Sequence, residues 1–200
     1  MKTLVMAHPV PTDVRKVITI EPDDYVIAVD QAVLACYKQR IKIDLAIGDF
    51  DSLKNQSMLN QLNVERLNPI KDVTDTNHAL MRASAFNQPV YLIGGIGGDR
   101  IEHFYAHTLF FDAFPNLIIL NERSMIKRLF VGSHTFSRTD DFISFFAYPR
   151  ATITLSGFKY DLDRYTLSTY DPRCISNETL RDATIDVHEG SVLVIQTIRD

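Results

Sequence analysis

The chain has 200 residues, of which 46% are hydrophobic, so it can bury a substantial core as one large domain or as two small ones. Its formal net charge of −4 leaves no excess of Lys and Arg, which argues against a nucleic-acid partner. No apolar run approaches the roughly 20 residues needed to span a membrane, and the two cysteines lack the spacing of a zinc site or disulfide framework, so we expect a cytoplasmic protein.

The N-terminal part of the chain alternates short apolar runs with segments of helical period, the pattern of a parallel sheet covered by helices. The run at 89–94 is continuously apolar, which is typical of a strand buried on both faces. Strands are predicted at 25–29, 44–48, 89–94 and 117–120, and helices at 31–40, 75–86 and 101–114.

After about residue 121 the pattern changes to β-rich runs separated by turn residues. These runs are 142–147, 151–155, 183–187 and 192–197. They predict an antiparallel sandwich or small barrel. We therefore predict an α/β domain with a mainly parallel sheet over 1–122, followed directly by an all-β sandwich domain over 123–200.

The clearest motif is Gly48-Asp49-Phe50-Asp51-Ser52, here called the acidic turn, which follows the predicted strand 44–48. In an open α/β sheet, ligands bind beyond the carboxyl ends of the strands, so these carboxylates lie where a site is expected. Asp49 and Asp51 can point to the same side of an extended segment and share a hard cation such as Mg²⁺. The alternative is a turn in which Asp51 or Ser52 caps the following helix.

Asp72 and Asp75 form a second acidic group, at the start of the predicted helix 75–86. Asp and Thr are preferred N-cap residues, so capping alone can account for Asp72 or Thr74. A second acidic strand-to-helix junction in the same sheet would nevertheless bring Asp75 near the acidic turn, giving a set of carboxylates that holds Mg²⁺ against a polyphosphate. Asp30, at the end of strand 25–29, is a further candidate.

Gly94-Gly95-Ile96-Gly97-Gly98, here called the glycine loop, joins strand 89–94 to the next predicted helix. Glycines allow tight turns that present backbone amides to phosphate oxygens, and the following helix N-terminus favours negative charge. The alternative is a loop that only packs strand against helix. Arg100 strengthens the phosphate interpretation, because a guanidinium can pair with phosphate oxygens. His103 and His107 have the i, i+4 spacing of metal ligands, but without a third ligand we favour ordinary polar contacts near a site.

No Ser or Cys has a recognisable base partner, so covalent catalysis is not indicated. Acids, a glycine loop and an arginine point instead to phosphoryl-type transfer, in which positioning and charge neutralisation do most of the catalysis. Together with later motifs, this ordered set resembles the thiamine pyrophosphokinase family over about residues 25–197. The motifs are Ala-Val-Asp30-Gln-Ala, the acidic turn, Lys71-Asp72-Val73-Thr74-Asp75, the glycine loop up to His103, Gly157-Phe158-Lys159-Tyr160 and Ile175-Ser176-Asn177-Glu178.

The resemblance implies a catalytic α/β domain, a thiamine-binding β-sandwich domain, and a homodimer whose thiamine sites lie between the catalytic domain of one subunit and the β domain of the other. It implies that the thiamine hydroxyl attacks the β-phosphorus of ATP in the presence of Mg²⁺, giving thiamine diphosphate and AMP. By position, the magnesium and catalytic carboxylates would be Asp49, Asp51 and Asp75, with Asp72 or Asp75 as the base. Nucleotide-binding residues would be Asp30, Lys71, Gly95, Gly97, Gly98 and Arg100, and substrate-binding residues Glu102, His103, Ser176 and Asn177.

The chain departs from the family pattern at Asp99 and Glu102, where a glycine and a shorter acid are usual, at Ala7-His8-Pro9, and in having no tryptophan to stack on thiamine. Two alternatives stay open. One is the same diphosphate transfer to another heterocyclic alcohol, such as a hydroxymethyl pterin. The other is a nucleotide- or thiamine-binding sensor without catalysis, suggested by the added charge at Asp99 and the longer Glu102.

Overall fold

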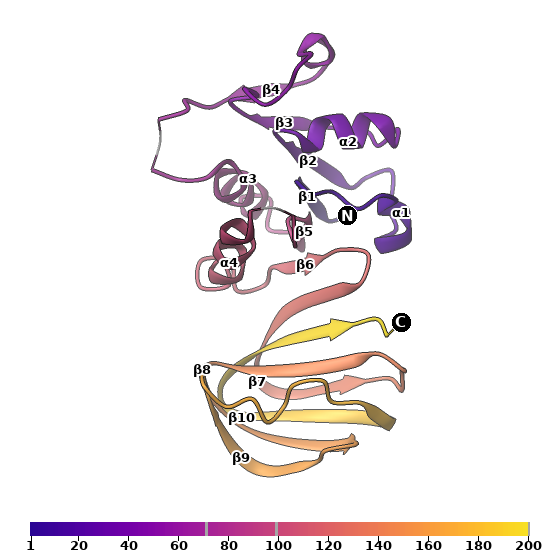
Figure 1. Cartoon of the computed structure of the whole chain (residues 1–200), viewed down its shortest axis with the longest axis vertical. Helices are drawn as coiled ribbons and strands as arrows, with labels where there is room; N and C mark the ends of the chain where they lie inside the picture. The colour runs from indigo at the N-terminus through magenta and orange to yellow at the C-terminus, as the bar shows by residue number, and fades with distance from the viewer. Residues whose placement is uncertain (71, 99, 200) are drawn as a thin grey trace. The chain divides into compact units, whose positions relative to one another are not determined.

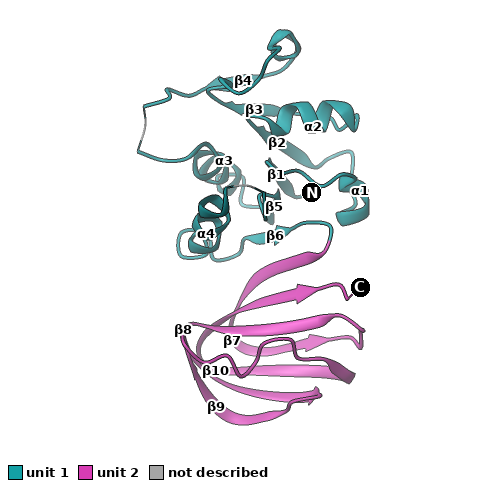
Figure 2. Ribbon diagram, viewed as in Figure 1, with its two compact units in different colours: residues 1–122 teal, residues 123–200 magenta. Residues whose placement is uncertain are grey.

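The computed structural model describes residues 1–70, 72–98 and 100–199, and it divides into two compact units, Met1–Glu122 and Arg123–Asp200 (Figure 2). Two residues singled out from the sequence, Lys71 and Asp99, lie outside the described residues. Each unit has its own strands and its own buried core, and each is described separately below.

The first unit is built on a parallel sheet, as the sequence predicts (Figure 1). Its strands lie in the order β4-β3-β2-β1-β5-β6. They are β1 (Thr3–Ala7), β2 (Tyr25–Val29), β3 (Leu45–Gly48), β4 (Val64–Arg66), β5 (Val90–Gly94) and β6 (Ile118–Leu120). The chain moves outward from β1 to β4 on one side and then returns to β5 on the other side of β1. The strand order therefore reverses between β1 and β5, where an open α/β sheet has its ligand-binding crevice.

Helices cover both faces of this sheet, which is why its central strands are apolar without alternation. Helix α2 packs against β1 and β2, and α3 packs against the strands from β1 to β3 and against β5. On one face, Leu4 and Met6 share a core with Val33 and Cys36 of α2. The helices are α1 (Val14–Val17), α2 (Ala32–Lys38), α3 (Asp75–Ser84) and α4 (Ile101–Leu109), with a short 3-10 helix η1 (Ser57–Gln61).

All three predicted helices are shorter than the periodicity predicts. The helix predicted at 31–40 spans only Ala32–Lys38, and the chain leaves it through Arg40, whose φ is 53°. The helix predicted at 101–114 ends at Leu109, and Pro115 disfavours helical backbone in the residue before it. The helix predicted at 75–86 ends at Ser84, and the chain reverses through Asn87, whose φ is 56°. Beyond the ends of α3 and α4, Phe86 packs against Tyr25 with ring centroids 4.8 Å apart, and Phe111 is buried, so the apolar spacing continues past the last helical residue.

The second unit is an antiparallel sheet in the order β7-β10-β8-β9. Its strands are β7 (Ser124–Phe136), β8 (Phe142–Phe158), β9 (Leu162–Ser168) and β10 (Thr179–Thr197). The runs predicted as separate strands at 142–147 and 151–155 are both parts of β8, and those at 183–187 and 192–197 are both parts of β10. The prediction was wrong there because the pairing register shifts without ending the strand, as a β-bulge allows.

One glycine makes the bend in β10 possible. Gly190 has φ 73°, and a Cβ there would lie 1.9 Å from the backbone oxygen of Arg150 on the paired strand β8. Inside the curved sheet, Phe136, Phe145 and Phe158 pack edge to face, with ring centroids 5.5 to 6.2 Å apart. The curvature thus encloses an aromatic core within this unit.

Among the described residues, no helix is long and apolar enough to cross a membrane.

Candidate active site

The carboxyl ends of the parallel strands carry most of the residues that the sequence singles out. The acidic turn leaves β3, Asp30 follows β2, and the glycine loop leaves β5. Strands β3 and β5 are separated by β2 and β1, so their ends lie about 14 Å apart at the usual strand spacing. A ligand that touches both the acidic turn and the glycine loop must therefore be extended.

The buried ring of Phe50 anchors the acidic turn to the core. Phe50 has φ 60° and is fully buried, so it turns its ring into the core, while Asp49 is half-buried and Asp51 is exposed. The Asp51 amide donates to Oδ1 of Asp49 at 3.1 Å, which keeps the two carboxylates on one short turn. The alternative of helix capping is wrong, because the next helix begins at Ser57 with Gln56 as its N-cap.

Asp30 supports the acidic turn from the neighbouring strand. Its Oδ1 accepts a hydrogen bond from the Phe50 amide at 3.3 Å, and its own amide donates to the Ile47 carbonyl. A Cβ on Gly48 would lie 1.8 Å from this carboxylate oxygen, so only glycine lets the two segments approach. Asp30 therefore positions the backbone between Asp49 and Asp51.

The second acidic group stands at the beginning of α3. Thr74 is the N-cap, and its hydroxyl accepts a hydrogen bond from the Asn77 amide at 3.2 Å. Asp75 lies in the first turn, where its charge complements the helix dipole, and Asp72 is exposed just before the helix. Capping thus accounts for Thr74, whereas Asp72 is exposed and Asp75 is half-buried in the first turn of α3.

The four glycines of the glycine loop adopt left-handed backbone: Gly94, Gly95, Gly97 and Gly98 have φ between 67° and 84°. The Gly95 amide donates to the Pro9 carbonyl at 3.1 Å, which ties the loop to the end of β1 at the reversal of strand order. A Cβ on Gly94 would lie 2.3 Å from the same carbonyl oxygen, whereas one on Gly97 would meet nothing within 4 Å. The loop is therefore anchored at its start and open toward solvent at Gly97.

Arg100, just after the glycine loop, forms an ion pair with Glu102. Its Nε donates to Oε1 of Glu102 at 2.8 Å, and both side chains are largely exposed. This hydrogen bond lowers the pKa of Glu102, so the carboxylate is ionised at neutral pH. His103 lies on the same turn, with Nε2 3.9 Å from Oε1 of Glu102. Because these contacts are at the surface, an incoming phosphate can compete with Glu102 for Arg100 at small cost.

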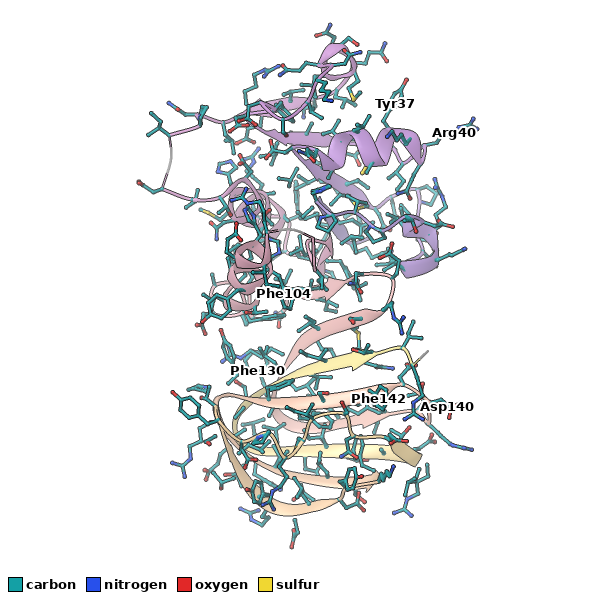
Figure 3. All side chains as sticks on the ribbon, viewed as in Figure 1. Tyr37, Arg40, Phe104, Phe130, Asp140 and Phe142 are labelled. Carbon is teal, nitrogen blue, oxygen red and sulfur yellow. The ribbon has the colours of Figure 1, made fainter. Side chains whose placement is uncertain are left out.

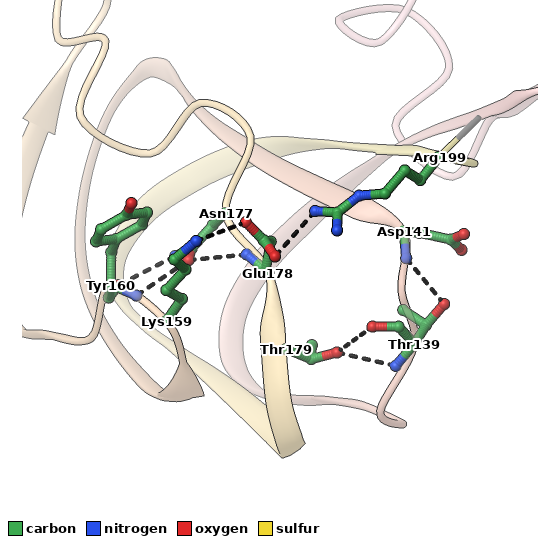
Figure 4. A network of polar contacts seen from close by, with 8 residues as sticks. All are labelled: Thr139, Asp141, Lys159, Tyr160, Asn177, Glu178, Thr179 and Arg199. Atoms are coloured by element: carbon green, nitrogen blue, oxygen red, sulfur yellow. Dashed lines mark hydrogen bonds and ion pairs between the residues drawn. The ribbon is translucent and has the colours of Figure 1, made fainter.

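In the second unit, Ser176 and Asn177 have different surroundings, and Figure 4 shows the contacts of Asn177. Asn177 is 1% exposed, its Oδ1 accepts from the amides of Tyr160 and Glu178, and its Nδ2 donates to the Tyr160 carbonyl. Ser176 is exposed with φ 54°, and its amide donates to Oγ of Ser144 at 2.9 Å. The side-chain amide of Asn177 is thus hydrogen-bonded to backbone within the protein, whereas the side chain of Ser176 lies at the surface.

Glu178 closes this network. It accepts from Nζ of Lys159 at 3.0 Å and pairs with Arg199 at 2.9 Å (Figure 4). Its hydrogen bonds from Lys159 and then from Arg199 lower its pKa, and the same contact raises the pKa of Lys159. The network joins the 176–178 segment to the end of β8 and to the last described residue of the chain.

The donor chemistry of the acidic turn fits magnesium. Within 1–70, 72–98 and 100–199, no three His, Cys, Asp or Glu side chains gather closely enough to hold a metal ion by themselves. Magnesium is usually held by one or two carboxylates together with waters and substrate phosphates, so a preformed cage is not required. Asp49 and Asp51 supply the right oxygen ligands at the right edge of the sheet.

Two hollows in the first unit lie away from this edge. One, of about 480 Å³, is lined by Tyr37, Lys38, Arg40 and Ile41, and the Tyr37 and Arg40 side chains project at the end of α2 (Figure 3). The other, of about 510 Å³, lies where β5 begins and includes Gln88, Pro89 and Phe114. The sequence motifs, and not these hollows, mark the candidate site.

Two side chains support the site from outside the main motifs; sequence reasoning predicted a polar contact near the site for the first and missed the second. His107 is buried beneath the glycine loop, and its Nδ1 lies 2.9 Å from the Gly95 carbonyl oxygen. Gln56 donates to the Phe50 carbonyl and accepts from Arg66, which bridges the acidic turn to β4. The i, i+4 histidine pair was the available signal for the first, and the sequence contains no comparable signal for the second.

Comparison with known proteins covers both units. The family model described as thiamin pyrophosphokinase, catalytic domain, matches residues 18–114, and that described as thiamin pyrophosphokinase, vitamin B1 binding domain, matches residues 133–192. The chain is 26% identical to the thiamine pyrophosphokinase of Bacillus subtilis, over 98% of this chain and 99% of the relative.

Among solved structures, a thiamin pyrophosphokinase family protein from Enterococcus faecalis superimposes with a TM-score of 0.85 at 26% identity, over the full length of both chains. The thiamin pyrophosphokinase from Geobacillus thermodenitrificans superimposes with a TM-score of 0.87 at 24% identity, over 100% of this chain and 99% of that one.

Proposed function

The chain belongs to the thiamin pyrophosphokinase family, and on that premise we propose that it transfers a diphosphate group from ATP to thiamine, yielding thiamine diphosphate and AMP. The observation that carries this proposal is the common edge of the parallel sheet, where the acidic turn and the glycine loop flank the reversal of strand order. A polyphosphate is an extended anion, and it matches an edge with metal-binding carboxylates at one end and backbone amides at the other.

In this proposal the α/β unit, residues 1–122, is the catalytic domain. Asp49, Asp51 and Asp75 would hold Mg²⁺, which when bound neutralises charge on the transferred group. Gly97, Gly98 and Arg100 would contact the phosphates, as would Lys71, and Gly95 would serve the nucleotide by anchoring the loop, because its amide and its carbonyl are already engaged. Asp30 would act by keeping the acidic turn in place, because its carboxylate already accepts from the Phe50 amide.

The β unit, residues 123–200, would be a sandwich domain that binds thiamine. The match of 133–192 to a vitamin B1 binding model supports thiamine, rather than a pterin alcohol, as the acceptor. Ser176 would contact thiamine directly, and Asn177 would fix the backbone that presents Ser176. Glu102 and His103 are the further substrate contacts that we propose.

The proposed reaction moves one proton and one diphosphate. The hydroxyl oxygen of thiamine forms a bond to the β-phosphorus of ATP, and the bond from that phosphorus to the oxygen bridging to the α-phosphate breaks. AMP leaves with the bridging oxygen, and a carboxylate, Asp72 or Asp75, accepts the hydroxyl proton. The proposal places this reaction in the cytoplasm, where ATP and magnesium are available.

Incubation of the purified protein with ATP, thiamine and Mg²⁺ tests the proposal. We expect AMP and thiamine diphosphate in equal amounts, and neither product when Mg²⁺ is replaced by a chelator. Absence of AMP in the complete mixture would overturn the proposed function.

We further propose that two copies of the chain associate and share each thiamine site. A shared site makes specific activity depend on protein concentration. We therefore expect specific activity to fall on dilution in parallel with the dimer fraction measured by sedimentation. Constant activity in a dilute, monomeric sample would contradict the shared site.

A further inference from the structure

A buried histidine lies directly beneath the glycine loop. His107 belongs to the last turn of α4 and is 3% exposed. Its Nδ1 lies 2.9 Å from the carbonyl oxygen of Gly95. The ring is packed against Phe110, with centroids 5.5 Å apart, and edge-on to His103 at 6.5 Å. These neighbours fix the plane of the imidazole, so Nδ1 stays aimed at the loop.

The chemistry of this contact determines where the proton is. A carbonyl oxygen can only accept a hydrogen bond, so Nδ1 of His107 is the donor. Burial lowers the pKa of His107, so the ring is neutral at neutral pH and its Nε2 carries no proton. The hydrogen bond to Gly95 raises the pKa of His107 and the charge of His103 lowers it, but burial is the largest effect and the pKa is lowered overall. The contact therefore requires the Nδ1-protonated neutral tautomer.

The same contact completes the anchoring of the loop. Gly95 donates its amide to the Pro9 carbonyl, and its own carbonyl accepts from His107. Both backbone polar groups of this one residue are thus held by long-range partners, one at the end of β1 and one on α4. A Cβ on Gly95 would lie 2.7 Å from the His107 ring, so the close approach also requires glycine here.

The orientation of the rest of the loop follows from this anchor. The peptide that joins Gly95 to Ile96 includes the carbonyl held by His107, so rotation of that peptide is blocked while the hydrogen bond persists. The N–H of Ile96, which belongs to the same peptide, is thereby held in one orientation. The exposed backbone at Gly97, where a Cβ would meet nothing within 4 Å, follows directly after it. A preformed loop avoids the entropy cost of ordering the backbone when a ligand binds.

We propose that His107 is a positioning residue for nucleotide binding: its Nδ1–H holds the Gly95 carbonyl and so keeps the glycine loop in the conformation that receives phosphate. This inference rests on the proposed function, because it takes ATP as the ligand of the loop. His107 itself does not touch the substrate, since its ring is buried below the loop.

Three substitutions separate this role from simple packing. His107→Asn places an amide nitrogen near the position of Nδ1 and can restore the donor. His107→Gln carries its amide nitrogen farther out, near the position of Nε2, and His107→Leu fills the space without a donor. Thr108→Ala is the matched control, because the Thr108 hydroxyl donates only to the Tyr105 carbonyl within α4, at 2.7 Å.

The readouts are KM for ATP, KM for thiamine and kcat, with ATP affinity from calorimetry and melting temperature for each variant. For His107→Leu we expect ATP affinity to fall about tenfold, since a buried carbonyl loses its donor, while KM for thiamine stays within about twofold. His107→Asn should recover most of the loss, and His107→Gln should not. Thr108→Ala should match the wild type in ATP affinity.

Equal effects of Asn and Gln, or unchanged ATP affinity in His107→Leu, would overturn the proposal. The tautomer gives a test that needs no turnover and no folded variant. Imidazole nitrogen resonances of the wild-type protein should place the His107 proton on Nδ1, and finding it on Nε2 would also overturn the proposal. Failure of the wild type to make thiamine diphosphate would instead overturn the proposed function, leaving the tautomer and the calorimetric ATP affinities to decide the role of His107.

Discussion

Replacing Asn177 by alanine tests whether this side chain stabilises the fold or contacts thiamine. The side chain makes three hydrogen bonds to backbone: it accepts from Tyr160 N at 3.1 Å and Glu178 N at 2.9 Å, and donates to Tyr160 O at 3.0 Å. Each such bond contributes about 1 kcal/mol net, so the sum is about 3 kcal/mol. Water can reach part of Tyr160, which is 56% exposed, so we expect a loss of about 2 kcal/mol.

Urea unfolding followed by circular dichroism measures this loss. For Asn177→Ala we expect a lower midpoint of the β unit's transition with an unchanged slope, because the surface exposed on unfolding stays the same. Ser176→Ala is the control, since it removes an exposed hydroxyl from the adjacent residue and should change the unfolding free energy by less than about 0.5 kcal/mol. If Asn177→Ala unfolds at the wild-type midpoint while KM for thiamine rises, Asn177 contacts the ligand and the reasoning is refuted.

Three further changes test other parts of the site. Asp51→Asn should lower turnover by about a hundredfold or more with an unchanged melting temperature, because the proposed metal ligand is lost from an exposed position without any change in packing; near-normal turnover would contradict the proposed metal assignment. Ser176→Ala should raise KM for thiamine by about tenfold and leave KM for ATP unchanged, as expected for one lost hydrogen bond, and the reverse pattern would mean that the acceptor site is misplaced. Because Lys159 holds the pKa of Glu178 below its ordinary value, ionised Glu178 stabilises the fold above the ordinary glutamate pKa, and this contribution is lost as pH falls through the lowered pKa. Glu178→Gln should therefore unfold at lower urea than the wild type at neutral pH, with a difference that shrinks in acid; a difference independent of pH would argue against the ion pairs.

The sequence predicted the elements whose signals are local. The apolar run at 89–94 corresponds to β5 (Val90–Gly94), and the acids after 44–48 follow β3. It did not reveal β7 and β9, since many of their side chains are exposed or only half-buried and the apolar alternation is diluted. It also divided β8 and β10 into shorter strands, because turn residues inside a bulge resemble those between strands.

The acidic turn illustrates how far local signals extend toward the site. Its composition and its place after a strand marked it as a ligand-binding candidate. The sequence could not indicate that Asp30 would hold it, because that contact depends on β2 and β3 being neighbours in the sheet. Likewise the sequence predicted Asn177 as a thiamine ligand, and only the fold shows the hydrogen bonds that its side-chain oxygen accepts from Tyr160 and Glu178.

The sequence by itself indicated a parallel α/β part followed by a β-rich part, the order of the motifs and the chemistry they can perform, because side-chain periodicity and charge are properties of neighbouring residues. Only the tertiary structure decided which groups support the site. The partners of Gly95 are Pro9 at the end of β1 and His107 on α4, and three separate segments meet there because the strand order reverses between β1 and β5. Hydrogen bonds between distant segments depend on the packing of the whole sheet, and that packing is not encoded in any one stretch of the chain.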